Sequence, residues 1–158
     1  MTKYCLAVFL LFLTKTVVSQ QPELQWAKTF DAHNPNNYRV NSNGRSVAVD
    51  QQGNVYSAGL FNHTIDFDPG PGVFTLTASN WAETGIYISK LSPTGDFIWA
   101  LQLSALVEFG NIEIRVDKDD NVYLASELRD ATDMDPGPGV YMLTPVGAVD
   151  AFVAKYDT

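Results

Sequence analysis

The sequence predicts an all-β protein built from antiparallel strands, and three observations support this prediction. Residues 49–56 return as residues 116–123, so one unit recurs along the chain at an offset of 67 residues. Short segments within each unit alternate apolar and polar residues and are rich in β-branched and aromatic side chains. Gly, Pro, Asn and Asp gather between these segments, where turns are needed. The pattern favours short strands joined by tight turns over helices.

The N-terminal residues are typical of a secretory signal peptide. Lys3 precedes an apolar run over residues 4–13, and the segment ends in Val-Val-Ser before Gln20. This predicts a signal over residues 1–19, cleavage after Ser19, and a secreted or cell-surface mature chain of residues 20–158. The apolar run is about half of the roughly 20 residues needed to cross a bilayer, so we expect no membrane span in the mature chain.

Charge and cysteine content exclude several classes of function. The chain has 10 basic and 18 acidic residues, and removal of Lys3 and Lys15 with the signal leaves 8 basic residues and a net charge of −10. Such a surface repels nucleic acid and anionic lipid, so we expect no nucleic-acid partner. The one cysteine, Cys5, lies inside the signal. The mature chain therefore has no disulfide, thiolate metal site or cysteine nucleophile.

The strands can be placed in order along the two units. Residues 24–30 match residues 97–103 and predict an isolated outer strand of the kind that ends a unit. The first repeat, residues 44–103, has four predicted strands: 46–50, 54–61, 85–91 and 97–103. The second repeat, residues 111–158, has three: 112–117, 121–127 and 151–156. Tight turns are expected at Gln52-Gly53, Thr94-Gly95-Asp96 and Asp119-Asp120, because Gly and Asp tolerate positive φ.

The order of motifs resembles a known repeat. Each unit has Val-Asp, then Asn-Val-Tyr after a turn, then a loop with Asp-Pro-Gly-Pro-Gly, then a Lys in the third strand, and the first unit ends in Phe-Ile-Trp-Ala. This pattern resembles the SBBP β-propeller repeat of secreted bacterial proteins. The Asp-Pro-Gly-Pro-Gly variant is similar to the version in large exported proteins of the Bacteroidota. The resemblance covers residues 24–158, with two departures in loops: Asp120 replaces the usual Gly, and Thr84-Gly85 replaces the Gly-x-x-Asp seen at residues 147–150.

The resemblance implies about two blades of an incomplete ring. A propeller closes about 4 to 8 four-stranded antiparallel blades around an axis, so two units cannot close one. We therefore expect an N-terminal fragment of a longer protein, whose remaining blades would be the partners of these two. In a complete ring, residues 24–30 would complete the last blade. The alternatives are several short chains assembled into one ring, or an open sheet with exposed edges.

One group of residues is a candidate metal site. A pair of carboxylates recurs in the two Asp-Pro-Gly-Pro-Gly loops: Asp66 and Asp68 in the first, and Asp133 and Asp135 in the second. Carboxylate and free carbonyl oxygens are the ligands that Ca²⁺ prefers. The competing interpretation is structural. Asp-Pro-Gly predicts a type II turn, with positive φ at the Gly, and an Asp that accepts hydrogen bonds from free backbone N–H groups. Apart from Ca²⁺, we expect no cofactor.

The aromatic residues and histidines give weaker signals. Trp26 and Trp99 occupy equivalent strand positions, which is typical of packing within or between blades, whereas Trp81 lies in an irregular loop and is the better candidate for stacking on a sugar. His33 and His63 lack the spacing of a zinc site. No Gly-x-Ser-x-Gly elbow, metalloprotease His pair, P-loop or dinucleotide fingerprint is present, and no residue is assigned a catalytic role.

These observations favour an exported, non-enzymatic repeat scaffold, a secreted or cell-surface binding or adhesion module with a glycan or protein ligand. Two alternatives stay open. The chain could be part of a secreted carbohydrate-active enzyme whose catalytic residues lie outside it. It could also be a calcium-stabilised structural repeat, for which Ca²⁺ would raise the melting temperature and Asn at Asp66, Asp68, Asp133 and Asp135 would lower it.

Overall fold

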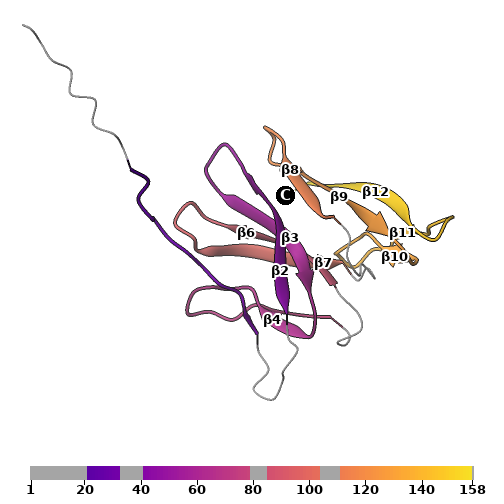
Figure 1. Ribbon diagram of the computed structural model, residues 1–158, viewed down its shortest axis with the longest axis horizontal. Helices are drawn as coiled ribbons and strands as arrows, with labels where there is room; N and C mark the ends of the chain where they lie inside the picture. Colours follow the sequence, from indigo (N-terminus) through magenta and orange to yellow (C-terminus); the bar gives the residue numbers. More distant parts are fainter. Residues whose placement is uncertain (1–20, 33–40, 79–84, 104–110, 158) are drawn as a thin grey trace, which may run out of the picture.

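The computed structural model describes residues 21–32, 41–78, 85–103 and 111–157, and every regular element in these ranges is a β-strand (Figure 1). Two larger antiparallel sheets lie side by side, and two short hairpins accompany them. The predicted all-β class is confirmed, with one four-stranded and one three-stranded blade-like sheet. No helix in the described part of the chain is long and apolar enough to cross a membrane. The predicted signal, residues 1–19, lies outside the described residues.

The first sheet, called the first blade below, contains the four strands that the sequence predicted. Its order is β2-β3-β6-β7, and all three pairings are antiparallel. The pairing of β2 with β3 continues past an irregularity between Gly44 and Ser46, so β2 begins earlier than the prediction of residue 46. The strands are β2 (Ser42–Val49), β3 (Val55–Phe61), β6 (Gly85–Leu91) and β7 (Phe97–Leu103).

The second sheet, called the second blade, has the order β12-β9-β8. Its strands are β8 (Glu113–Val116), β9 (Val122–Leu128) and β12 (Asp150–Tyr156), close to the predicted ranges. Within the described residues, β12 pairs with β9 alone, so its other edge carries no strand. That edge corresponds to the side of β6 on which β7 lies in the first blade.

Two short hairpins were not predicted. They bracket the two Asp-Pro-Gly-Pro-Gly loops and consist of β4 (Thr64–Asp66) with β5 (Thr75–Thr77), and β10 (Thr132–Asp133) with β11 (Met142–Leu143). Their strands are two or three residues long, too short for an alternating pattern to reveal.

Residues 24–30, predicted as an isolated outer strand, lie outside the sheets. These residues show no sheet pairing, and a strand starts only at β1 (Asp31–Ala32), which pairs with β4. The lack of pairing follows from the lack of a partner strand. The equivalent strand, β7, forms by pairing with the third strand of its own blade, and no such strand lies beside residues 24–30 among the described residues.

The predicted turns are confirmed at three hairpins. Gly53 and Gly95 have φ of 85° and 81°, and Asp120, which is equivalent to Gly53, has φ of 63°. Asp is one of the few residues with a side chain that adopts this conformation at modest cost. The departure of the second repeat from Gly at this position therefore leaves the hairpin intact.

The main core lies between the two blades. Because side chains of a strand alternate between its faces, alternate residues of β3 and β6 face the second blade, among them Tyr56, Leu60 and Ile86. Residues of the second blade pack against them, namely Ile112, Ile114, Val122, Leu124, Leu128, Met134 and Phe152. The backbone N–H of Ile114 also donates to Ser46 Oγ at 3.2 Å. The interface between blades is thus continuous and apolar.

A second core covers the opposite side of the first blade. Phe61, Ile65, Phe67, Ala78, Tyr87 and Ala100 are its buried members. Phe30 packs onto it with ring centroids 4.9 Å from Phe67 and 5.9 Å from Tyr87. The segment before β1 is therefore held on this side of the blade by its side chains rather than by backbone pairing.

Candidate functional site

The first-blade hairpin between β2 and β3 is closed by a buried carboxylate, Asp50. It accepts hydrogen bonds from the backbone N–H of Gln52 at 3.0 Å, and from the backbone N–H and the side-chain amide of Asn54 at 2.8 Å each. Tyr56 OH donates to it at 3.3 Å, and Lys90 Nζ lies 3.5 Å away while contacting the face of the Tyr56 ring. We call this group the Asp50 box.

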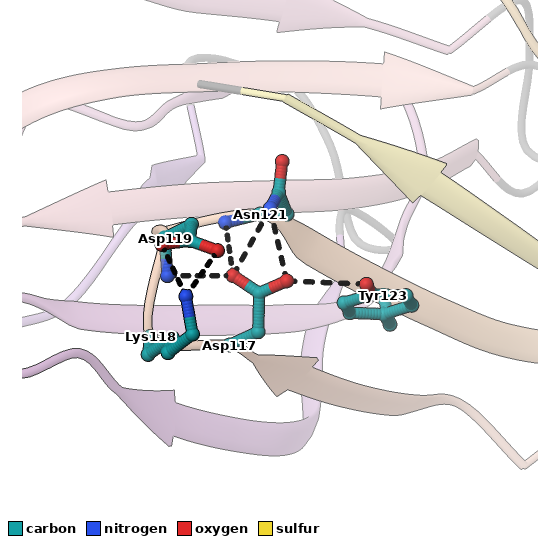
Figure 2. A network of polar contacts seen from close by, with 5 residues as sticks. All are labelled: Asp117, Lys118, Asp119, Asn121 and Tyr123. Carbon is teal, nitrogen blue, oxygen red and sulfur yellow. Dashed lines mark hydrogen bonds and ion pairs between the residues drawn. The ribbon is translucent and has the colours of Figure 1, made fainter.

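The second blade repeats this arrangement around Asp117 (Figure 2). Asp117 accepts from the backbone N–H of Asp119 at 2.9 Å, from the backbone and side chain of Asn121 at 2.9–3.1 Å, and from Tyr123 OH at 3.1 Å. Lys155 Nζ lies 5.6 Å from the centroid of the Tyr123 ring. No ion pair between Lys155 and Asp117 is seen, in contrast to Lys90 and Asp50. We call this group the Asp117 box.

Both carboxylates are held ionised. Hydrogen bonds from Asn121, then from backbone N–H groups and Tyr123, lower the pKa of Asp117 to about 2. Burial raises the pKa of Asp50, but the donors from Asn54 and the charge of Lys90 outweigh it and lower the pKa overall. Acceptor-only carboxylates in this state act as structural anchors for the hairpins, because their oxygens are already used by donors.

The two Asp-Pro-Gly-Pro-Gly loops are built by the same use of carboxylates. Asp66 Oδ1 accepts from the backbone N–H of Asp68 at 3.0 Å and of Phe74 at 2.9 Å, which joins the two ends of the loop. Asp68 Oδ1 accepts from Gly70 N at 2.8 Å. In the second loop Asp133 accepts from Asp135 N and Tyr141 N, and Asp135 accepts from Gly137 N. The predicted capping role of these residues is confirmed.

The predicted type II turn is wrong. Neither Gly70 nor Gly137 has positive φ, so conformational freedom is not why Gly is needed in these loops. The reason is a close approach. A Cβ placed on Gly72 would overlap Asp68 Oδ2, and one on Gly139 would overlap Asp135 Oδ2. The carboxylate lies against the chain at the last Gly of the motif, so a side chain at that position would require the carboxylate to move.

The calcium interpretation of these loops stays a prediction. Asp66 and Asp68 share one loop, and Asp133 and Asp135 the other, but each of these four residues uses one carboxylate oxygen to accept hydrogen bonds from backbone N–H groups. Within the described ranges, no group of three or more His, Cys, Asp or Glu side chains gathers where a metal ion would be held. A Ca²⁺ ion would therefore have to take most of its six to eight oxygens from elsewhere.

Each loop presents an apolar residue outward. Val73 is 72 % exposed and Val140, its counterpart, is 74 % exposed, each directly after the last Gly of the motif. The residues that follow, Phe74 and Tyr141, are also exposed, Tyr141 more so. A loop fixed by its own carboxylates thus carries apolar side chains that its own blade does not cover.

A groove of about 850 Å³ lies between the two blades at the free edge of β12. Trp99 and Leu101 of β7 line one side, Val153, Lys155 and Tyr156 of β12 another, and the loop from Met134 to Tyr141 the third. Tyr156 OH donates to the carbonyl of Met134 at 3.2 Å, and burial together with the charge of Asp135 raises the pKa of Tyr156 to about 12. Tyr156 is thus a neutral hydrogen-bond donor at neutral pH.

The aromatic predictions have mixed outcomes. Trp99 packs edge-on against Tyr56 at 5.9 Å, as expected for packing. Trp26 donates from Nε1 to the carbonyl of Pro93 at 3.0 Å and thereby ties its segment to the first blade. Trp81 and His33 lie outside the described residues. The Asp50 and Asp117 boxes were missed, and no catalytic role is assigned to any residue.

Comparison with known proteins identifies one similar sequence. The chain is 26 % identical over 119 residues to an uncharacterized WD repeat-containing protein of Acanthamoeba polyphaga mimivirus, and the match covers 71 % of this chain and 9 % of that protein. No family model and no solved structure matches. The chain is thus similar to a repeat protein of which it spans a small part, and its fold is of the repeated, propeller-like β type.

Proposed function

We propose that this chain is an exported, non-enzymatic repeat scaffold that binds a protein or glycan ligand through its Asp-Pro-Gly-Pro-Gly loops. The observation that carries the proposal is the pair Val73 and Val140. Both are more than 70 % exposed, both follow a self-closed loop, and both lie at the same place in their repeats. Apolar side chains held on a rigid frame bind at little cost in ordering.

The polar residues support a scaffold. Asp50 and Asp117 accept hydrogen bonds at both carboxylate oxygens, and Asp66 and Asp133 at one oxygen each, from donors of their own hairpins. Carboxylates used in this way stabilise turns. The resemblance to SBBP repeats of exported Bacteroidota proteins and the signal-like residues 1–19 support export to the cell surface or medium.

A binding experiment tests the ligand part of the proposal. The purified chain is applied to arrays of glycans and of extracellular matrix proteins, followed by the double variant Val73→Ser, Val140→Ser. We expect binding that this variant loses, since both exposed apolar groups are removed. Val146→Ser is the matched control, because Val146 is 98 % exposed outside these loops. No bound ligand, or equal binding by the loop variant, would contradict the proposal.

Export has its own test. A culture expressing the complete reading frame should release the chain, and N-terminal sequencing should find Gln20 as the first residue, because the small residue Ser19, with Val17 two places before it, suits cleavage by a signal peptidase. Retention of residues 1–19 on the mature protein would contradict it.

A further inference from the structure

Asn43 is the one asparagine of the sequence that is followed by glycine, Gly44. Asparagine is among the thermolabile residues of proteins, because the backbone nitrogen of the next residue can attack its side-chain amide. Glycine favours this attack, since it has no Cβ to obstruct the approach. The outcome then depends on how the fold holds the amide and the backbone beside it.

Other asparagines of the described residues are held by their neighbours. Asn54 and Asn121 donate their side-chain amides to the carboxylates of the two boxes, at 2.8 Å and at 2.9–3.1 Å. Asn62 is buried, and its side-chain oxygen accepts from the backbone N–H of Asn41 at 2.8 Å. Asn43, in contrast, is exposed, and its side chain makes no hydrogen bond with the described part of the chain. Its amide is therefore not kept away from the backbone.

The backbone at Asn43 is close to the start of a strand. β2 begins at Ser42, and its pairing with β3 is irregular between Gly44 and Ser46. Among the described strands, β2 stands at the edge of its sheet, as does its counterpart β8, so this position belongs to the repeat itself. Strand ends open locally at little cost in free energy. Opening of this end lets the extended backbone bend toward the amide.

The second repeat lacks the reactive pair. At the offset of 67 residues, Asn43 and Gly44 correspond to Gly110 and Asn111, and Asn111 is followed by Ile112. A β-branched side chain on the attacking residue crowds the approach to the amide. The two repeats therefore differ in chemistry at this place, although their first two strands pair in the same antiparallel manner.

We infer that Asn43-Gly44 is a site of spontaneous deamidation and isomerisation. The backbone nitrogen of Gly44 loses its proton and forms a bond to Asn43 Cγ, the C–N bond of the side-chain amide breaks, and ammonia leaves. Water then opens the resulting five-membered succinimide at one of its two carbonyl carbons. Opening at the side-chain carbonyl gives Asp. Opening at the main-chain carbonyl gives isoaspartate, in which the chain continues through the former side chain.

The isoaspartyl form does not fit the strand pairing at this place. It adds a methylene to the main chain, and the Asn43 carbonyl lies so close to Gly59 of β3 that a Cβ on Gly59 would overlap it. Beyond this contact, the backbone N–H of Asn62 donates to the Asn41 carbonyl at 3.0 Å and closes the end of the ladder. Isomerisation shifts both contacts and detaches the start of β2 from β3. Deamidation to Asp adds only a negative charge at an exposed position.

The first experiment incubates the purified chain at neutral and at mildly alkaline pH and follows the tryptic peptide of residues 40–45 by mass spectrometry. A synthetic peptide of residues 38–48, treated alike, is the unfolded reference. We expect conversion of Asn43 to Asp and isoaspartate, faster at the higher pH. Its rate should be within about tenfold of the rate in the peptide, because the end of β2 opens readily. A slower rate would show that the strand protects Asn43 and would overturn the inference.

Gly44→Ala is the matched control. Gly44 does not have positive φ, and a Cβ there would meet Tyr87 OH only at 3.7 Å, so we expect the fold to be kept. The added methyl group should slow conversion by about tenfold or more. Equal conversion of this variant and the wild type, or faster conversion of another asparagine, would also overturn the inference.

Hydrogen exchange tests the structural consequence. The isoaspartyl form, separated by chromatography, should lose protection at residues 41–44 and 59–62. Asn43→Asp should keep this protection, because its main chain is unchanged. Loss of protection in both forms, or in neither, would show that the added methylene does not detach the start of β2.

Discussion

The two blades share their motifs but differ in how far their strands are covered. Ile88 in β6 is fully buried, whereas Val153, its counterpart in β12, is 72 % exposed. Conversely, Ile114 of β8 is fully buried and its counterpart Val47 in β2 is 61 % exposed. The same position is thus core in one repeat and surface in the other. Burial in this protein depends on what stands beside a blade, not on the blade's own sequence.

The largest expected effect comes from truncating equivalent positions. Ile88→Ala should lower the free energy of unfolding by about 2–5 kcal/mol, because it leaves a cavity in the core between the blades. Val153→Ala should change it by less than about 0.5 kcal/mol. Urea unfolding at low protein concentration measures both. Equal costs would show that β12 is covered in the single chain.

The hairpin carboxylates should differ in the same direction. Asp50→Asn should lower the free energy of unfolding by about 1–3 kcal/mol, because the side chain has no exposed surface and Lys90 loses its counter-charge. Asp117→Asn should cost less, because Asp117 is only half-buried and has no ion pair with Lys155. Urea denaturation of both variants measures the difference. A larger loss from Asp117→Asn would contradict this ranking.

Acid should reveal the Asp117 box through its pKa. The pKa is about 2 in the folded protein and 3.8 in its ordinary state, so the stabilisation is complete above about pH 4 and is lost as the pH falls through about 2. Measurement of unfolding free energy between these limits should give a steeper decline for the wild type than for Asp117→Asn. The same pH dependence for both proteins would mean that ionisation of the Asp117 carboxylate contributes nothing to the free energy of unfolding.

The smallest expected effect concerns the hairpin turns. Gly53→Ala should cost about 1 kcal/mol, because Gly53 has φ of 85° and a Cβ disfavours this conformation. Gly53→Asp should cost less, since Asp120 adopts φ of 63° at the equivalent place. Thermal unfolding compares the two. A larger loss of stability for Gly53→Asp than for Gly53→Ala would mean that other contacts hold the second hairpin in its conformation.

Much of the fold was readable from the sequence, because the repeat and the alternation within strands are local signals. The seven longer strands lie close to their predicted ranges. Residues 24–30 were predicted as an isolated strand and lie unpaired, but the short β1 that follows them was not predicted, because its pairing with β4 is a contact in space. The role of Gly72 was missed for a similar reason, since the approach of Asp68 to it is a contact in space.

The two boxes were within reach of sequence analysis. Asp50, Asn54, Tyr56 and Lys90 recur as Asp117, Asn121, Tyr123 and Lys155. Polar residues that are identical in both copies, and spaced to meet across a hairpin, were the signal. The groove was not readable in this way, because it arises from the absence of a strand beside β12 in the described residues.

The Asp50 and Asp117 boxes also bear on how the chain folds and how such chains grow. Each joins residues within seven positions of one another, apart from one Lys, so the hairpin closes at small cost in loop entropy. We expect each repeat to contain its own starting point for folding. Duplication of one repeat in the gene would then add a unit whose folding starts from its own hairpin contacts. The number of blades can therefore change while each blade keeps the same folding route.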